Sequence, residues 1–176
     1  MNTLLKFFRG FAESAAFVCA LLASTTAFSE TALIPPGSLW KYLDNGSDQG
    51  TTWRSSAFVD TTWKSGPAQL GYGDGGEATV VSFGSSSTAK YITTYFRRTF
   101  SVADAAAFTS LKLRLLRDDG AVVYLNGVEI RRDNLPTGSI NYRTLAPVAI
   151  GGADETTFFE TTVPTSALVT GSNVLA

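Results

Sequence analysis

The stretch RDDGAVVYLNGVEIRRDNLP, Arg117 to Pro136, carries the clearest structural signal in the chain. It places two turn signals, Asp119-Gly120 and Asn126-Gly127, on either side of the β-forming run Ala121 to Leu125. Asn-Gly between two apolar runs is the strongest short hairpin signal, because both residues tolerate the positive φ angles of a tight turn. The two acidic residues in this stretch leave a second reading open, in which the loop binds a ligand or a metal.

The alternation of apolar and polar residues extends the strand pattern in both directions. Leu111, Leu113 and Leu115 alternate with charged residues, which indicates one buried and one solvated face. Residues 111–131 therefore predict a three-stranded meander. The same reasoning predicts five further strands, at Leu39–Leu43, Thr79–Phe83, Thr93–Val102, Thr156–Val163 and Asn173–Ala176. We expect an all-β fold, an antiparallel β-sandwich of jelly-roll type, with its last strand truncated.

The first 29 residues have the features of a secretory signal peptide. Lys6 and Arg9 precede a short apolar run, and Ala27-Phe28-Ser29 supplies small residues before a cut at Glu30. We therefore predict a signal peptide over residues 1–29 and a single domain over residues 30–176, in a secreted or periplasmic bacterial protein. A retained membrane anchor is the alternative, although the run falls short of the about 20 apolar residues that a span needs.

The composition restricts the chemistry that the chain can perform. It has no histidine, which removes Ser-His-Asp and Cys-His catalysis and every histidine-based metal site. The one cysteine, Cys19, lies within the predicted signal peptide, so the remainder has no disulfide framework. The formal net charge is −1 and no basic patch stands out, so we expect no nucleic-acid partner.

Arg98 is an expected structural residue. It shares a strand face with Phe96, Phe100 and Val102, where an unpaired charge would be costly. We predict that it pairs with one of the two aspartates of the Asp118-Asp119-Gly120 turn, and we assign the pair to Arg98 and Asp118.

Aromatic residues in the Gly-rich region before the central strands are candidates for ligand contact. Aromatic faces stack on the apolar faces of sugar rings, and Trp53, Trp63 and Tyr72 could form such a platform. The alternative for the tryptophans is burial in the core, where an indole also anchors a loop. Three polar residues in or near the two turns could add directional hydrogen bonds: Asp119, Asn126 and Arg131.

A structural calcium ion is the one cofactor that we consider. Calcium prefers carboxylate and carbonyl oxygens from flexible loops. Asp74 and Asp118 are the candidate ligands, since each lies in a glycine-containing loop. The alternative for Asp118 is a turn cap or the ion pair with Arg98.

Two groups of motifs resemble a known family. DDGAVVYLNGVEI, with LVTGSNVLA near the carboxyl end, resembles the galactose-binding-domain-like β-sandwich, and WKSGPAQLGYGDG with TTYFRRTF is similar to a jelly-roll module of large secreted bacterial proteins. The resemblance covers Leu39 to Ala176 and implies an accessory module like the carbohydrate-binding modules of glycoside hydrolases. The last strand of such modules runs past Asn-Val-Leu-Ala, and here the chain departs from the pattern.

Three functions follow from these expectations. The first is a non-catalytic carbohydrate-binding module, an accessory domain of a larger extracellular protein, with a polysaccharide or glycan and other domains of that polypeptide as partners. The second is a structural or interaction module without a sugar ligand, which burial of the tryptophans would favour. The third is a small glycan hydrolase that uses only carboxylates, which requires two acidic side chains across one cleft.

Overall fold

Ten strands and four single turns of 3₁₀ helix form along the described part of the chain, residues 30–176 of this computed structural model. The predicted signal peptide lies outside the described residues. The strands are β1 (Leu39–Leu43), β2 (Lys64–Pro67), β3 (Leu70–Gly71), β4 (Thr79–Val80), β5 (Tyr95–Val102), β6 (Leu111–Leu115), β7 (Ala121–Leu125), β8 (Val128–Asp133), β9 (Phe159–Val163) and β10 (Gly171–Leu175). The 3₁₀ turns are η1 (Thr52–Arg54), η2 (Ala105–Ala107), η3 (Gly152–Glu155) and η4 (Thr165–Ala167). No described helix is long and apolar enough to cross a membrane.

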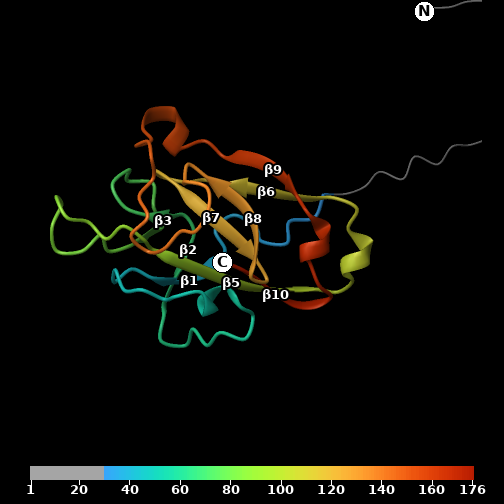
Figure 1. Cartoon of the computed structure of the whole chain (residues 1–176). Coiled ribbons are helices and arrows are strands. Elements are labelled where there is room, and N and C mark those ends of the chain that lie inside the picture. The colour runs from blue at the N-terminus through green and yellow to red at the C-terminus, as the bar shows by residue number, and fades with distance from the viewer. Residues whose placement is uncertain (1–29) are drawn as a thin grey trace, which may run out of the picture. The chain divides into compact units, whose positions relative to one another are not determined.

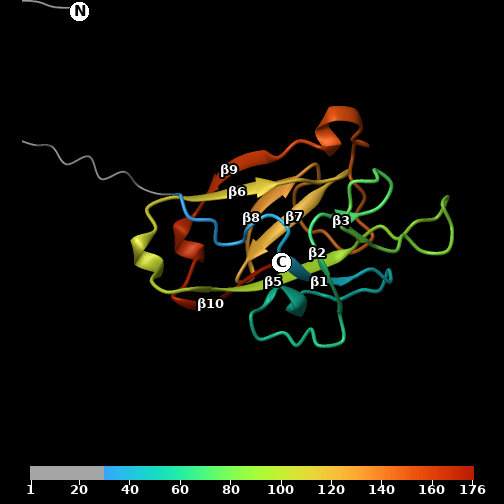
Figure 2. The same ribbon diagram turned by 180° about the vertical axis from the view of Figure 1, so that it is seen from behind.

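The strands form an antiparallel β-sandwich, which confirms the predicted fold class. Six strands make the main sheet in the order β2-β1-β5-β10-β7-β8, and every pair in it is antiparallel. β6 and β9 form a second antiparallel pair and lie side by side along one side of β7 and β8 (Figures 1 and 2). β3 and β4 form a two-residue parallel ladder.

The predicted meander over residues 111–131 is wrong in one connection. β7 and β8 form the expected hairpin, but β6 pairs with β9 in the other sheet. The Asp118-Asp119-Gly120 corner therefore carries the chain from one sheet to the other. Gly120 is required there, because a Cβ at this position would lie 2.6 Å from the carbonyl oxygen of Asn134.

The main sheet buries side chains on both faces. On β5, Tyr95 and Arg97 point to one face, while Phe100 and Val102 point to the other. The first face carries the aromatic cluster, formed by Trp53, Trp63, Tyr95 and Tyr124. The second carries the aliphatic cluster, formed by Val102, Leu125, Ala167 and Leu168, against which Leu111 of β6 packs.

Candidate functional site

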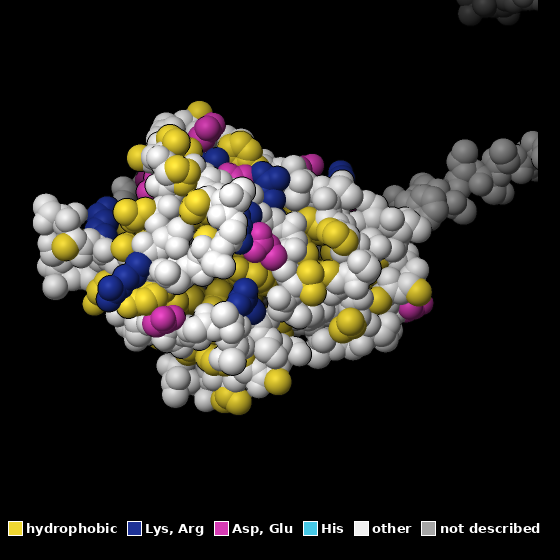
Figure 3. Space-filling model, in the orientation of Figure 1, with side chains coloured by type: hydrophobic (Ala, Val, Ile, Leu, Met, Phe, Trp, Pro, Cys, Tyr) yellow, Lys and Arg dark blue, Asp and Glu magenta, His cyan; other side chains and the backbone are white. Residues whose placement is uncertain are grey.

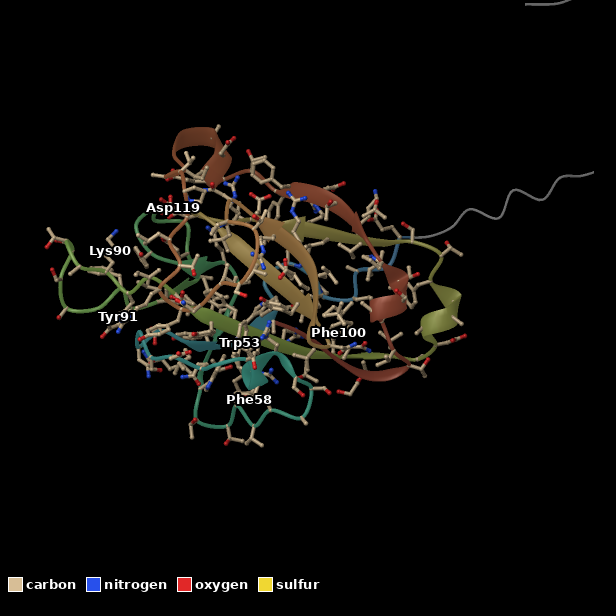
Figure 4. The ribbon with its side chains drawn as sticks, in the orientation of Figure 1. Trp53, Phe58, Lys90, Tyr91, Phe100 and Asp119 are labelled. Atoms are coloured by element: carbon tan, nitrogen blue, oxygen red, sulfur yellow. The ribbon has the colours of Figure 1, made fainter. Side chains whose placement is uncertain are left out.

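Several connecting loops meet at one end of the sandwich. Lys90, Tyr91 and Asp119 all lie at this loop end, whereas Phe100 lies toward the other end (Figure 4). The rings of Tyr72 and Phe83 are 5.2 Å apart, and Lys90 Nζ lies 4.8 Å from the centroid of the Tyr72 ring. The space-filling view shows basic side chains next to apolar ones at this end (Figure 3).

Tyr91 is an exposed aromatic residue whose ring lies against two glycines. A Cβ on Gly46 would lie 2.4 Å from Cδ1 of the Tyr91 ring, and a Cβ on Gly84 would lie 3.3 Å from Cε1. The ring thus rests against two backbone segments that only glycine permits, and both glycines have positive φ angles. The Tyr91 amide also donates to the carbonyl of Phe83 at 2.9 Å. The side chain nevertheless remains 39% exposed.

A pocket of about 220 Å³ opens beside this ring. Its walls combine aromatic, aliphatic and basic side chains: Gly46, Lys90, Tyr91, Ile92, Tyr142 and Arg143. The loop after β8 is held there by the Thr93 hydroxyl, which donates to the carbonyl of Tyr142 at 2.9 Å. An open site with a fixed aromatic face and flexible cationic donors suits a polar ligand that has an apolar face, such as a sugar ring.

Asp119 is a predicted ligand residue, and the structure places it near Tyr72 at the loop end. Its carboxylate accepts a hydrogen bond from the amide of Ile150 at 2.8 Å, and its carbonyl accepts from the Asn134 side chain at 2.9 Å. These bonds give Asp119 a loop-fastening role. Burial, and then the nearby carboxylates of Asp118 and Asp119, raise the pKa of the Tyr72 hydroxyl.

The two tryptophans proposed as a platform are buried. Trp53 is 8% exposed and Trp63 is 5% exposed. The Trp53 ring lies edge-on to Tyr95 at 4.8 Å and to Tyr124 at 5.9 Å. The interpretation as an exposed platform is therefore wrong for both rings, because they are buried. They hold the long loop between β1 and β2 against the sheet.

Asn126 and Arg131 are not among the residues that line the Tyr91 pocket. Asn126 occupies the hairpin turn at the opposite end of β7 from Asp119, with a φ of 53°. Its side-chain amide donates to Asn173 Oδ1 at 2.8 Å, and its Oδ1 accepts from the amide of Val174 at 2.9 Å. Arg131 forms an ion pair with Asp133. The structure thus does not bring the six predicted ligand residues into one site.

The candidate calcium ligands do not form a cluster. The amide of Asp74 donates to Glu77 Oε1 at 2.9 Å, and Asp118 Oδ1 accepts from the amide of Asp119 at 2.8 Å. Both aspartates are exposed. Within residues 30–176 no three acidic side chains lie close enough together to hold a metal ion.

The predicted pair of Arg98 with Asp118 is replaced by other contacts. Arg98 Nη1 donates to the carbonyl of Leu39 on β1. Its neighbour Arg97, on the opposite face, is the deeply buried arginine at 2% exposure. Arg97 Nε donates to Asp60 Oδ2 at 2.9 Å, and its guanidinium also donates to the carbonyls of Trp53, Ser55 and Phe58.

Two further carboxylates are fixed by ion pairs. Asp44 is 3% exposed and lies 2.8 Å from Lys64 Nζ. Burial alone would raise the pKa of Asp44, but the bonds from Lys64 and the Ser82 amide lower it overall. The neighbouring guanidinium of Arg131, and then that of Arg117, lower the pKa of Asp133. Each of these groups acts in the fold as a structural anion.

Comparison with known proteins yields only partial structural matches. No family model matches the chain, and no curated protein matches it. A β-glycosidase from Bacteroides vulgatus is similar over 81% of this chain and 16% of its own length, at 15% identity and a TM-score of 0.45. A β-glucuronidase of an uncultured Clostridium sp. is similar over 79% of this chain and 20% of its own length, at 20% identity and a TM-score of 0.44. A β-glucuronidase from Lactobacillus rhamnosus is similar over 82% of this chain and 22% of its own length, at 18% identity and a TM-score of 0.42.

Each match covers only a domain-sized part of the enzyme. The chain spans 16–22% of the lengths of these three proteins, so the similarity concerns a part of each and not its activity as a whole.

Proposed function

We propose that this protein is an exported, non-catalytic module that binds carbohydrate in the pocket beside Tyr91. The observation that carries the proposal is the exposed Tyr91 ring, which rests against the backbone at Gly46 and Gly84. A ring that is already fixed loses little conformational entropy when a ligand stacks on it. Lys90 and Arg143 at the rim supply hydrogen-bond donors for hydroxyl or acidic groups of a glycan.

A polysaccharide pull-down and a glycan array test this proposal on the purified protein. We expect Tyr91→Ala to weaken binding about tenfold, which corresponds to about 1.4 kcal/mol. Tyr91→Phe keeps the stacking face and should bind within about twofold of the wild type. Absence of binding across diverse glycans, or full binding by Tyr91→Ala, would remove the proposal. Repeating the assay with a chelator tests whether calcium contributes.

A structural or interaction module is the second candidate. It is favoured by the burial of Trp53 and Trp63, which removes the two largest aromatic rings from ligand contact. A carboxylate-only hydrolase is less well supported. Neither of the two pockets at Tyr91 and at Arg97 is lined by two carboxylates, and the one acidic residue, Asp60, is already paired with Arg97.

Export is a separate part of the proposal with its own test. Expression of the full chain in a bacterial host should yield a periplasmic or secreted product that begins at Glu30, which amino-terminal sequencing would detect. Recovery of the uncut chain in the membrane fraction would instead support the anchor.

A further inference from the structure

The two cations of the Tyr91 pocket differ from the other basic residues of the described chain. Within residues 30–176, the side chains of Lys90 and Arg143 are those that make no hydrogen bond and no ion pair with another described residue. Every other lysine and arginine in this range donates to a backbone carbonyl or pairs with a carboxylate. Both unpaired cations therefore line one and the same pocket.

Aromatic rings hold these two cations without occupying their hydrogen-bond donors. Lys90 Nζ lies 4.8 Å from the centroid of the Tyr72 ring and 5.6 Å from that of Phe83. The guanidinium carbon of Arg143 lies 5.1 Å from the centroid of the Tyr142 ring. A cation on a ring face is attracted by the π electrons, so its N–H groups remain available to a ligand. Both basic side chains are exposed.

The surroundings of the pocket leave these positive charges uncompensated. No carboxylate is among the side chains that line it. Burial, and then the charges of Asp118 and Asp119, raise the pKa of the Tyr72 hydroxyl, so these carboxylates lie within electrostatic reach of Lys90. They accept hydrogen bonds from the amides of Asp119 and Ile150 instead. Unpaired cations at an open site attract an anionic group of a ligand.

The second pocket, at Arg97, contains cations that serve the fold. Lys41, Arg97 and Arg98 line it together with Asp60. Arg97 pairs with Asp60, and the other two each donate to a backbone carbonyl. A concentration of basic residues is thus not sufficient for an anion site, and the pocket beside Tyr91 is distinguished by cations that have no partner within residues 30–176.

We propose that the glycan bound beside Tyr91 is acidic, and that Lys90 and Arg143 hold the carboxylate or sulfate group of the bound sugar; this inference rests on the proposed carbohydrate-binding function. The sugar ring stacks on Tyr91, and its acid group accepts charge-assisted hydrogen bonds from both cations. The guanidinium donates in a fixed fork that fits two oxygens of one acid group, and the ammonium adds a point charge. The site thus selects acidic over neutral polysaccharides.

Two pairs of polymers vary the charge on an otherwise similar sugar chain. Polygalacturonate is compared with its neutral methyl ester, and dextran sulfate with dextran, by titration calorimetry on the purified protein. At least one acidic polymer should bind about tenfold or more tightly than its neutral counterpart, and the pair that shows this preference identifies the acid group. Raising sodium chloride from about 0.02 M to about 0.5 M should reduce the preference, because salt screens exposed charges.

Charge-removing variants locate the preference in the pocket. Lys90→Gln and Arg143→Gln should each reduce it about threefold or more, and the double variant should bring it within about twofold of unity. Lys90→Arg keeps the charge and should keep the preference. Lys112→Gln is the matched control, since it removes an equally exposed cation that pairs with Glu160 on the β6–β9 ladder outside the pocket. It should bind the acidic polymer as the wild type does.

Three results would overturn the inference. Equal affinity for acidic and neutral polymers, with Tyr91→Ala weakening both, would refute the acidic ligand and leave the carbohydrate function standing. Polyglutamate is an anionic polymer without sugar, and binding of it as tight as that of the acidic polysaccharide would show that charge alone is sufficient. An equal loss in Lys112→Gln would place the effect outside the pocket. Absence of binding to all of these polymers would also refute the inference, while the glycan array decides the carbohydrate function separately.

Discussion

Arg97 and Asp60 form an ion pair, 2.9 Å from Nε to Oδ2, that fixes the loop between β1 and β2 to the main sheet. The same guanidinium donates to three carbonyls of this loop and lies 5.1 Å from the centroid of the Phe58 ring. The only regular structure in this loop is the single 3₁₀ turn η1, and one buried side chain on β5 satisfies three of its carbonyl groups, which have no strand partner.

Arg97→Met should therefore destabilise the protein by about 3 kcal/mol or more, because it leaves Asp60 and the loop carbonyls without their donor. Arg98→Met is the matched control on the same strand. It removes one hydrogen bond, to the carbonyl of Leu39, and should cost about 1 kcal/mol. Urea unfolding of both variants gives the two values. A larger loss in Arg98→Met would contradict the assignment of the structural role to Arg97.

Asn126 combines a turn conformation with a hydrogen-bond network, and two substitutions separate these roles. Both Asn126→Gly and Asn126→Ala remove the bonds to Ala167, Asn173 and Val174. Only glycine accepts the φ of 53° without strain. We expect Asn126→Gly to lose about 2 kcal/mol and Asn126→Ala about 1 kcal/mol more. Equal losses in thermal unfolding would show that the backbone conformation does not matter.

Local signals were sufficient to predict most strands and the hairpin at Asn126-Gly127. The alternation at Leu111, Leu113 and Leu115 predicts a strand because its period is fixed by backbone geometry. It does not say which strand is the partner, so β6 was predicted to pair with β7, whereas it pairs with β9. The choice of partner strand depends on how the two sheets pack. An Asp-Gly turn such as Asp119-Gly120 suits both a hairpin within one sheet and a connection between two sheets, so it does not distinguish them.

The role of Arg97 was missed for a similar reason. Strand parity places Arg98 among apolar neighbours, so the ion pair was assigned to Arg98, while Arg97 on the other face was given no role. That face is covered by an aperiodic loop whose path depends on Trp53 and Trp63 packing against Tyr95. A sequence pattern contains no information on such a path, so the buried cation was assigned to the wrong residue.

The Tyr91 site was also absent from the predictions. Its components come from three separate loops, around Gly46, Lys90 and Tyr142. The only local signal is the presence of Gly46 and Gly84 in polar loops, and glycine is common in loops for many reasons. The contact of both glycines with one ring follows from the tertiary structure alone.

The ionisation of Asp133 makes the stability of the protein depend on pH in the acidic range. Arg131 and Arg117 lower its pKa below the ordinary value of 3.8. A carboxyl with a lowered folded pKa stabilises the protein fully above its unfolded pKa and loses that contribution as the pH falls through the folded value. Asp133→Asn should thus be less stable than the wild type at pH 7, and the difference should shrink below about pH 4. A difference that stays constant between pH 7 and pH 2 in urea unfolding would contradict this.

Gly46→Ala tests whether the backbone positions the Tyr91 ring, and Gly50→Ala is its matched control. Both glycines have positive φ angles, 71° and 58°, so both variants incur the left-handed strain of about 1–2 kcal/mol. A new Cβ at Gly50 meets nothing within 4 Å, whereas one at Gly46 would lie 2.4 Å from the Tyr91 ring and must displace it. Gly46→Ala should therefore be less stable than Gly50→Ala by about 1 kcal/mol in thermal unfolding. It should also lose glycan binding that Gly50→Ala retains. Equal stability and equal binding in the two variants would show that Tyr91 is not held by Gly46, and the proposed sugar-binding face would lose its fixed position.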